Sequence, residues 1–261
     1  LSVGMGGALI AALAIMAGYA IWQLREQALQ AGRAAVDDHA FSLAAHAAQV
    51  VSGADFVLNS MVQLVESSAP PDSAALRQRF ATQETYEQLR LRQQSQPAID
   101  VVTLIDAEGR LIAFSRQYPA PEMDLSDRES FRTQQAGDAS QPYISAPVRN
   151  RTNERWTFHL SRRLVSPEGR FIGIAAVGLS TEYLSNFYAT VRLDRRVDRP
   201  DTATTLLRSD LVTMARGPVD DRVIGAPLAA SGPYRALDFV VDAPSFAPPR
   251  HAPLVTWETS E

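Results

Sequence analysis

The sequence predicts an α+β fold in which one long N-terminal helix covers an antiparallel β-sheet. The segment Leu1–Leu24 contains no charged side chain. Apolar residues then recur at every seventh position as far as Leu64, which is typical of a continuous helix that packs along one face. From Val101 onward the pattern changes to short β-rich runs separated by turns that contain glycine. Helices in one part of a chain and antiparallel strands in another indicate an α+β domain.

The uncharged segment 1–24 predicts a transmembrane helix. About 20 apolar residues, at about 1.5 Å per residue, span the ~30 Å hydrocarbon core of a bilayer. A cleaved signal sequence is the alternative, but its apolar region usually has only ~7–15 residues, and this run continues to Trp22. Because the chain begins with Leu1, we expect it to be a fragment, so the charges that would orient the helix are missing on one side.

Residues 25–69 continue this helix as a stalk. The seven-residue series consists of Trp22, Leu29, Val36, Leu43, Val50, Val57 and Leu64. Four residues after its later members lie Ala40, Ala47, Ala54 and Met61. This seam can pack on the helix's own domain or pair with a second copy of the chain, and the sequence leaves both open. Pro70 and Pro71 end the helix, since proline cannot continue it.

The remaining chain predicts further elements. A second helix is expected over 73–94, and a third from Ser180 to about Val191. Strands are expected over 101–105, 110–114, 143–148, 155–165 and 170–179, and weaker ones over 204–208 and 211–216. The connection 116–142 is long for a compact domain, and long connections often bind ligands. The proline-rich tail 242–261 has no periodicity, so it is either disordered or the edge of an incomplete domain.

Composition and missing motifs argue against several functions. The net charge of −4, with acids and bases interspersed, does not indicate a nucleic-acid surface. The absence of cysteine excludes thiolate metal sites, disulfides and cysteine nucleophiles. His39 and His46 lie ~10 Å apart along a helix, too far to share a metal ion. No nucleophile elbow, phosphate loop or kinase signature occurs. We therefore expect no catalytic residues, metal or cofactor, and no enzyme within this chain.

A set of short motifs appears in a characteristic order. The motifs are Leu104–Arg110, Ser126–Phe131, Ile144–Val148, Arg155–Phe158 and Leu160–Arg163. Together with the anchor and the long helix, they resemble the double Cache (dCache, PDC-like) sensor domain of bacterial transmembrane receptors. The resemblance is strongest to the domains that precede GGDEF diguanylate cyclases and histidine kinases. It covers residues 1–193, and 204–225 is similar to the start of the family's second subdomain.

The resemblance implies an architecture and a function. It implies a PAS-like sheet in a membrane-distal ligand-binding subdomain over 70–191, and a partial membrane-proximal subdomain over 192–261. The soluble part would lie outside the cytoplasm, in the periplasm, anchored in the bacterial inner membrane. It would bind a small molecule on the sheet beneath the long connection and signal to a diguanylate cyclase or histidine kinase outside this chain. The alternative is a membrane-tethered protein-interaction domain that senses no small ligand.

The same motifs assign the ligand-binding residues. They are Arg128, Phe131, Tyr143, Ser145, Trp156, Phe158, Ser161 and Ser180. Arg128 can hold a carboxylate with two parallel hydrogen bonds. Amine-binding members of the family have an aspartate where this chain has Ser180, so we expect a carboxylate or another small metabolite rather than an α-amino acid.

Alternation along strand 155–165 leaves one point open. Trp156 and Phe158 share one face of the strand, and Thr157, His159 and Ser161 share the other. Only one of these faces can line the pocket. The sequence does not decide whether the two aromatic side chains face the ligand or lie under the long helix.

Overall fold

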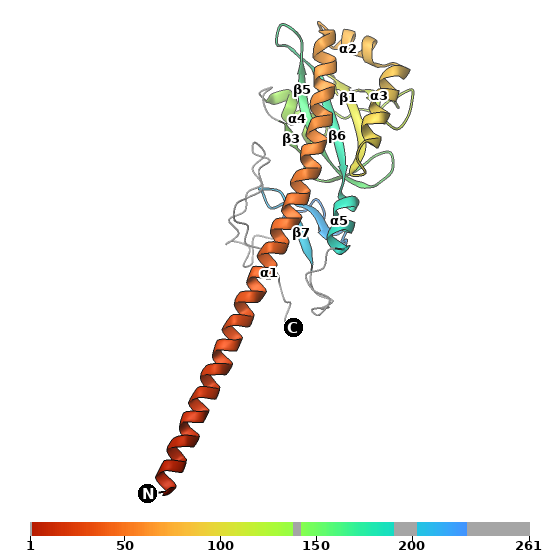
Figure 1. Ribbon diagram of the computed structural model, residues 1–261. Coiled ribbons are helices and arrows are strands. Elements are labelled where there is room, and N and C mark those ends of the chain that lie inside the picture. Colours follow the sequence, from red (N-terminus) through yellow and green to blue (C-terminus); the bar gives the residue numbers. More distant parts are fainter. Residues whose placement is uncertain (1, 138–141, 191–202, 229–261) are drawn as a thin grey trace.

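The N-terminal helix α1 runs without a break over Ser2–Ser68, so the predicted anchor and the predicted stalk form one rod (Figure 1). The computed structural model describes residues 2–137, 142–190 and 203–228 of the 261-residue chain. The helix ends at Ala69, which adopts a left-handed backbone with φ of 45° directly before the two prolines. The prediction that proline stops this helix is confirmed.

Two short helices follow where the sequence predicted one. Helix α2 covers Ser73–Phe80 and helix α3 covers Gln83–Gln94. The prediction of a continuous helix over 73–94 is wrong because Thr82 leaves the helical backbone and caps α3, its Oγ1 accepting the Thr85 N–H at 3.2 Å. Asp72 caps α2 in the same way, and its Oδ1 accepts the Ala75 N–H at 2.8 Å.

A six-stranded antiparallel sheet forms the body of the domain. Its strands are β1 (Ile99–Asp106), β2 (Leu111–Phe114), β3 (Tyr143–Ile144), β4 (Val148–Arg149), β5 (Trp156–Val165) and β6 (Phe171–Ser180). The order is β2-β1-β6-β5-β3, and β4 also pairs with β5. Both predicted hairpins are present, with Gly109 and Gly169 at positive φ in their turns. The single strand predicted over 143–148 is instead two short ones on either side of Pro147, which has no N–H for the sheet.

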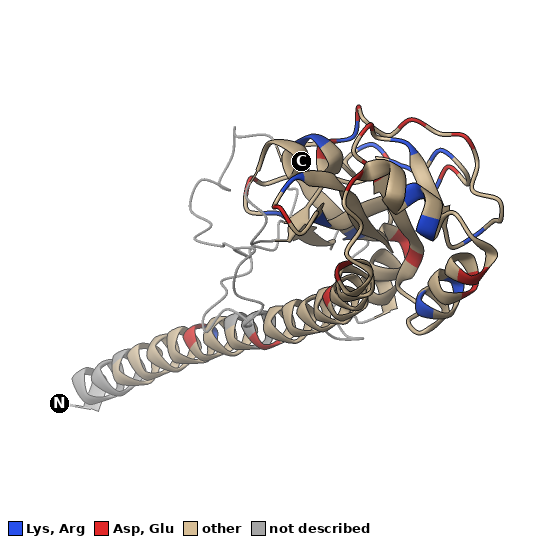
Figure 2. Cartoon of the chain, turned by 90° about the horizontal axis from the view of Figure 1, so that it is seen from above, with Lys and Arg blue, Asp and Glu red and all other residues tan. Residues whose placement is uncertain are grey.

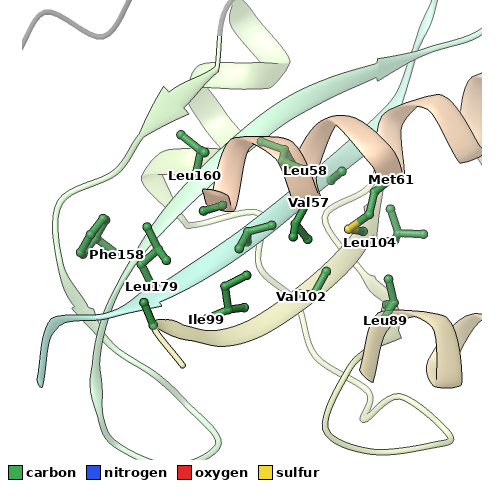
Figure 3. Packing of buried hydrophobic residues seen from close by; sticks show 14 of the residues in the cluster. Val57, Leu58, Met61, Leu89, Ile99, Val102, Leu104, Phe158, Leu160 and Leu179 are labelled. Carbon is green, nitrogen blue, oxygen red and sulfur yellow. The ribbon is translucent and has the colours of Figure 1, made fainter. Parts of the chain in front are cut away.

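Helix α1 covers one face of this sheet and supplies much of the core. Leu58 and Met61 of α1 are 0% and 1% exposed, and they pack with Val102 of β1 and Leu160 of β5 (Figure 3). The seam residues Leu43, Val50 and Val57 are buried in the same cluster. Along this part of α1 the seam therefore packs on its own domain.

The second face of the sheet carries an unexpected helix. Helix α4 spans Glu129–Ala136 within the long connection 116–142, where the sequence predicted no helix. Its N-cap position is Arg128, whose side chain makes no capping hydrogen bond, so the usual signal for a helix start is missing. Phe131 of α4 packs against Ile174 of β6 and Phe114 of β2, in an apolar cluster separate from the one under α1.

A small second sheet follows the third predicted helix. Helix α5 spans Thr181–Thr190, and strands β7 (Thr204–Leu207) and β8 (Thr213–Gly217) form an antiparallel hairpin. The hairpin packs closely on α5. A Cβ atom at Gly217 would lie 2.6 Å from the Ala189 nitrogen, so only glycine fits there. The predicted tail 242–261 lies outside the described residues, and the predicted α+β class is confirmed.

The core contact between α1 and the sheet gives a first prediction. Replacing Leu58 by alanine removes a fully buried side chain and should lower the free energy of unfolding by about 2–5 kcal/mol. Leu91→Ala, the same change at a position that is 65% exposed, should alter it by less than about 0.5 kcal/mol. Urea unfolding of the detergent-solubilised chain, followed by circular dichroism, measures both. Equal losses in the two variants would contradict the packing described here.

Candidate functional site

The two faces of β5 have different surroundings. Phe158 and Leu160 belong to the cluster under α1, and Arg162 on that face pairs with Asp55 of α1 at 3.1 Å. Thr157 and His159 lie on the opposite face, over Gly178 of β6. Of the two faces that the sequence left open, the one that carries Thr157, His159 and Ser161 therefore faces away from α1, toward α4 and the loops. We call it the polar face.

Tyr143 and Ser145 belong to this polar face. Tyr143 lies directly opposite Ser161 in the register of β3 and β5, and opposite residues of neighbouring strands share a face. Ser145 lies next to His159, whose backbone N–H donates to its Oγ at 3.0 Å. The sequence motifs assigned Tyr143, Ser145 and Ser161 to one ligand site, and the fold places all three on the polar face.

Asp100 of β1 is the polar centre at one end of this face. Its carboxylate accepts hydrogen bonds from the Thr157 Oγ1 at 3.1 Å and from the Asn150 Nδ2 at 3.2 Å. Arg116, which follows β2, forms an ion pair with it and donates its Nε to the Asp100 carbonyl at 3.0 Å. The side chains of Asp100 and Arg116 are only 7% and 18% exposed. This pair therefore fastens the 149–155 loop to the edge of the sheet.

An open pocket of about 500 Å³ lies against the Asp100–Arg116 pair. Its lining comes from α3, β1, β2 and the residues after it, the 152–155 loop and the end of β6: Gln93, Pro97, Ile99, Asp100, Phe114, Arg116, Gln117, Thr152, Asn153, Arg155 and Ser180. This volume matches that of pockets that hold small molecules. Ser180 is the one predicted site residue in this lining, and its Oγ also caps α5 by accepting the Tyr183 N–H at 3.1 Å.

Arg128 stands above the polar face without an acidic partner. Its side chain is half-buried, and its hydrogen bond is a long one of 3.5 Å from Nη2 to the Arg149 carbonyl. In the part of the chain that the structure describes, no carboxylate forms an ion pair with it. Burial lowers the pKa of Arg128 and the neighbouring Arg151 lowers it further, against the opposing charge of Asp127. The site therefore holds a guanidinium whose charge is not fully compensated.

Glu129, the next residue, ties α4 to its neighbours. Its carboxylate accepts the Tyr143 hydroxyl at 2.5 Å and the Ala146 N–H at 2.8 Å, and it pairs with Arg208, beyond β7, at 3.4 Å. Burial alone would raise the pKa of Glu129, but these hydrogen bonds and the Arg208 charge hold it below the ordinary value. The carboxylate is therefore ionised. Its oxygens are engaged by Tyr143, Ala146 and Arg208, so it does not neutralise Arg128.

The predicted aromatic residues are divided between different places. Phe131 is 2% exposed and meets Phe171 edge-on, with ring centroids 5.9 Å apart. Phe158 lies on the other side of the sheet, under α1. Trp156 donates its Nε1 to Asp221 at 3.0 Å, while the Arg149 guanidinium lies 4.7 Å from its ring centroid. The fold brings none of these rings next to the Asp100–Arg116 pair.

Sequence reasoning missed Asp100 and Arg116. One signal was present, because Asp100 is the only charged residue near the start of an otherwise apolar strand, Ile99-Asp100-Val101-Val102. Figure 2 shows acidic and basic residues side by side on the loops of the domain, whereas α1 carries few of them. Among the described residues, no group of three or more histidine and acidic side chains could hold a metal ion.

Comparisons with solved structures identify the type of domain. The extracellular domain of rpHK1S-Z16, a protein described as a histidine kinase, is 31% identical and has a TM-score of 0.62, covering 73% of each chain. The ligand-binding domain of the chemoreceptor CtaA from Pseudomonas fluorescens, solved with L-valine, has a TM-score of 0.52 at 14% identity and covers 79% of this chain and 82% of that one. An extracellular ligand-binding receptor from Desulfohalobium retbaense has a TM-score of 0.53 at 15% identity, covering 71% of this chain and 31% of that one. No family model and no curated protein matches the sequence.

These likenesses define a class of sensor domains rather than of catalytic domains. The chain belongs to the Cache family of sensor domains, the dCache or PDC-like domains of bacterial histidine kinases and chemoreceptors.

The Asp100–Arg116 pair gives a second prediction. Asp100→Asn removes the negative charge and leaves the partly buried Arg116 uncompensated, which should lower the free energy of unfolding by about 3 kcal/mol. Glu182→Gln is the control, because its pair with Arg155 is long, at 3.9 Å, and exposed. That change should cost less than about 1 kcal/mol. The same urea titration measures both, and a neutral Asp100→Asn would refute the role of this pair.

Proposed function

We propose that this chain is the extracytoplasmic sensing domain of a membrane-bound bacterial signal transducer, and that its ligand is a small anion. The observation that carries the proposal is Arg128, a half-buried guanidinium without an acidic partner among the described residues. Membership of a sensor family supports the class of function. The polar face beneath Arg128 supports the class of ligand.

The physical argument concerns the charge balance of the site. A partly desolvated cation beside a second cation, Arg151, has lost hydration without gaining an ion pair among the described residues, because the nearby Asp127 is paired with Arg151. A carboxylate bound here supplies that charge, and guanidinium binds it through two parallel hydrogen bonds. Because the site is partly shielded from water, the attraction is stronger than at an exposed surface.

The same site disfavours an α-amino acid. The structural neighbour CtaA was solved with L-valine, which carries an ammonium group as well as a carboxylate. Here Ser180 cannot supply a negative charge, and its Oγ already caps α5. Asp100 is a carboxylate in the pocket lining, but Arg116, Asn150 and Thr157 already occupy its oxygens. We therefore expect an organic acid without an ammonium group.

We place the membrane anchor in residues 1–24 and expect it to lie in the inner membrane. By length and composition, the described stretch that could cross a membrane is Asp38–Ser68. That stretch packs on the sheet through its seam, so the domain core accounts for the apolar side chains of that seam. By contrast, Ile15 and Trp22 are 73% and 59% exposed, and their part of α1 projects away from the domain (Figure 1).

The relative that is described as a histidine kinase favours that output, with a diguanylate cyclase as the alternative. The unit over 70–191 would be the membrane-distal subdomain. The β7–β8 hairpin would then begin the membrane-proximal subdomain over 192–261. Arg208 and Asp221 connect it to the ligand side of the sheet through Glu129 and Arg149.

Arg128 gives a third prediction. At a ligand concentration 100 times the Kd, a bound organic acid should stabilise the wild-type chain by about 2.7 kcal/mol. Arg128→Gln should remove this stabilisation, while Arg132→Gln, at an exposed position of the same helix, should keep it. A thermal-shift screen of organic acids and amino acids on the detergent-solubilised chain measures the effect.

Three outcomes of this screen would count against the proposal. An undiminished response of Arg128→Gln would remove its assigned role, and a stronger response to amino acids would overturn the ligand class. If no small molecule stabilises the chain, the protein-interaction alternative becomes the better explanation.

We also propose that two copies pair through α1, on the side opposite the buried seam. Phe41 and Phe56 are 46% and 76% exposed, and between them lie the small residues Ala45, Ala48 and Ser52. These five positions follow helical spacing along one stripe. Copies anchored in one membrane by the same helix are parallel, so this stripe can meet itself.

Pairing along this stripe gives a fourth prediction. The chain has no cysteine, so a single Ser52→Cys variant reports on one position only. Mild oxidation in membranes should link two Ser52→Cys chains by a disulfide. Glu87→Cys, exposed on α3, should remain monomeric under the same conditions. Gel electrophoresis without reductant separates the two results, and the reverse pattern would exclude this interface.

A further inference from the structure

His159 lies at the centre of the polar face, and its ring occupies the space above Gly178, which has no side chain. It is paired with Gly178 across β5 and β6. A Cβ atom at position 178 would lie 3.2 Å from the His159 Nε2 and 2.6 Å from the Val101 Cγ1. The imidazole therefore rests over the bare backbone of β6, on the same side of the sheet as Arg128 and Asp100.

The charged neighbours of this ring come from three elements. Asp100 comes from β1, Arg116 from the segment after β2, and Arg128 from the start of α4. Gly178 of β6 lies beneath the ring, and the Oγ of Ser145, the residue after β3, accepts the His159 backbone N–H and does not bond the ring. Within the described residues the ring forms no hydrogen bond and is half-buried. It is a titratable group whose ring has no hydrogen-bond partner in the described part of the chain.

The charge balance around the ring keeps it neutral when the site is empty. Asp100 is matched by its ion pair with Arg116, so the uncompensated charge is that of Arg128. Burial lowers the pKa of His159 to about 4; Arg128 lowers it as well, Asp100 opposes the change, and Arg116 lowers it further. A second positive charge beside Arg128 is unfavourable until a negative charge arrives.

We infer that His159 determines specificity together with Arg128: it takes a proton from water when a small anion binds, and then donates its N–H to that anion. This inference rests on the proposed function and adds to it that the domain responds to an anion and to acidity together. The step balances, because one proton moves from solvent to a ring nitrogen and no other bond changes. The bound state then contains a carboxylate held between two cations.

The direction of the pH dependence follows from this proton uptake. The ring is neutral in the empty site above pH about 4, and the anion raises the pKa of His159 in the complex. Between the two pKa values each binding event takes up as much as one proton. The affinity therefore increases as the pH falls, by at most about tenfold per pH unit. Above the pKa of the complex the affinity is independent of pH.

The test uses trifluoroacetate as the probe, because this carboxylate stays ionised throughout the pH range used. Calorimetric titration of the detergent-solubilised chain at pH 5 and pH 7 gives its affinity. Titration in two buffers of different ionisation enthalpy gives the number of protons taken up. We expect at least fivefold tighter binding at pH 5 and the uptake of a measurable fraction of a proton.

Two variants separate the role of His159 from a general effect of pH. His159→Gln keeps a polar side chain but cannot take up a proton, so its affinity should change by less than twofold between the two pH values. His46→Gln changes a histidine of α1 that stacks on Phe187, far along the chain from this site. It should retain the full pH dependence of the wild type.

The experiment distinguishes a failure of the anion site from a failure of the role of His159. If trifluoroacetate and the organic acids of the thermal-shift screen do not bind at either pH, the anion site itself is refuted. If trifluoroacetate binds without proton uptake, or if His159→Gln keeps the pH dependence, the anion site stands and the role of His159 is refuted. With only four histidines in the chain, their titration by nuclear magnetic resonance shows directly whether the anion raises the pKa of His159.

Discussion

The structure depends on the packing of α1 against the sheet. A six-stranded antiparallel sheet needs one covered face, and the seam of α1 supplies the cover through side chains such as Leu58 and Met61, which are almost fully buried. Ala54, also fully buried, lets the helix approach the strands closely. Because α1, together with α2 and α3, covers this face, a ligand can reach the sheet only from the other side. The position of the site is therefore a consequence of the core.

The free face of the sheet combines an apolar part with a polar part. Phe131 closes the apolar part, while the pair of Asp100 and Arg116 fixes the loop at the other end. Between them stand His159 and Arg128, which are half-buried and form no ion pair with a carboxylate among the described residues. A protein interior usually pairs its buried charges. An arginine without an ion-pair partner in the described part of the chain is therefore the place where a ligand's charge is expected.

The sequence predicted those features that depend on residues close together in the chain. The helix through residue 68, the two hairpins with Gly109 and Gly169, and the β7–β8 hairpin all have local signals of period or turn chemistry. Helix α4 has no such signal, since it lacks a capping side chain. The sequence predicted one helix over 73–94 instead of two because a single residue, Thr82, separates α2 from α3.

The candidate site was harder to predict for a different reason. Alternation correctly grouped the side chains of β5 into two faces, but only packing decided which face α1 would cover. Asp100 meets Asn150 and Thr157 across 50 and 57 positions of sequence. No local pattern reports a contact over that separation, so the polar centre of the site appears only in the fold.

Because α1 is continuous, a small tilt at one end of the helix displaces its other end. Its last part is fixed to the sheet, and the part before Ala40 extends ~57 Å beyond that contact, at about 1.5 Å per residue. A tilt of only about 3° at the sheet would displace the far end by about 3 Å. Shifts of about 1–2 Å between packed elements are common in switching proteins. A rod without a hinge therefore needs no large rearrangement near the ligand to produce a displacement at its other end.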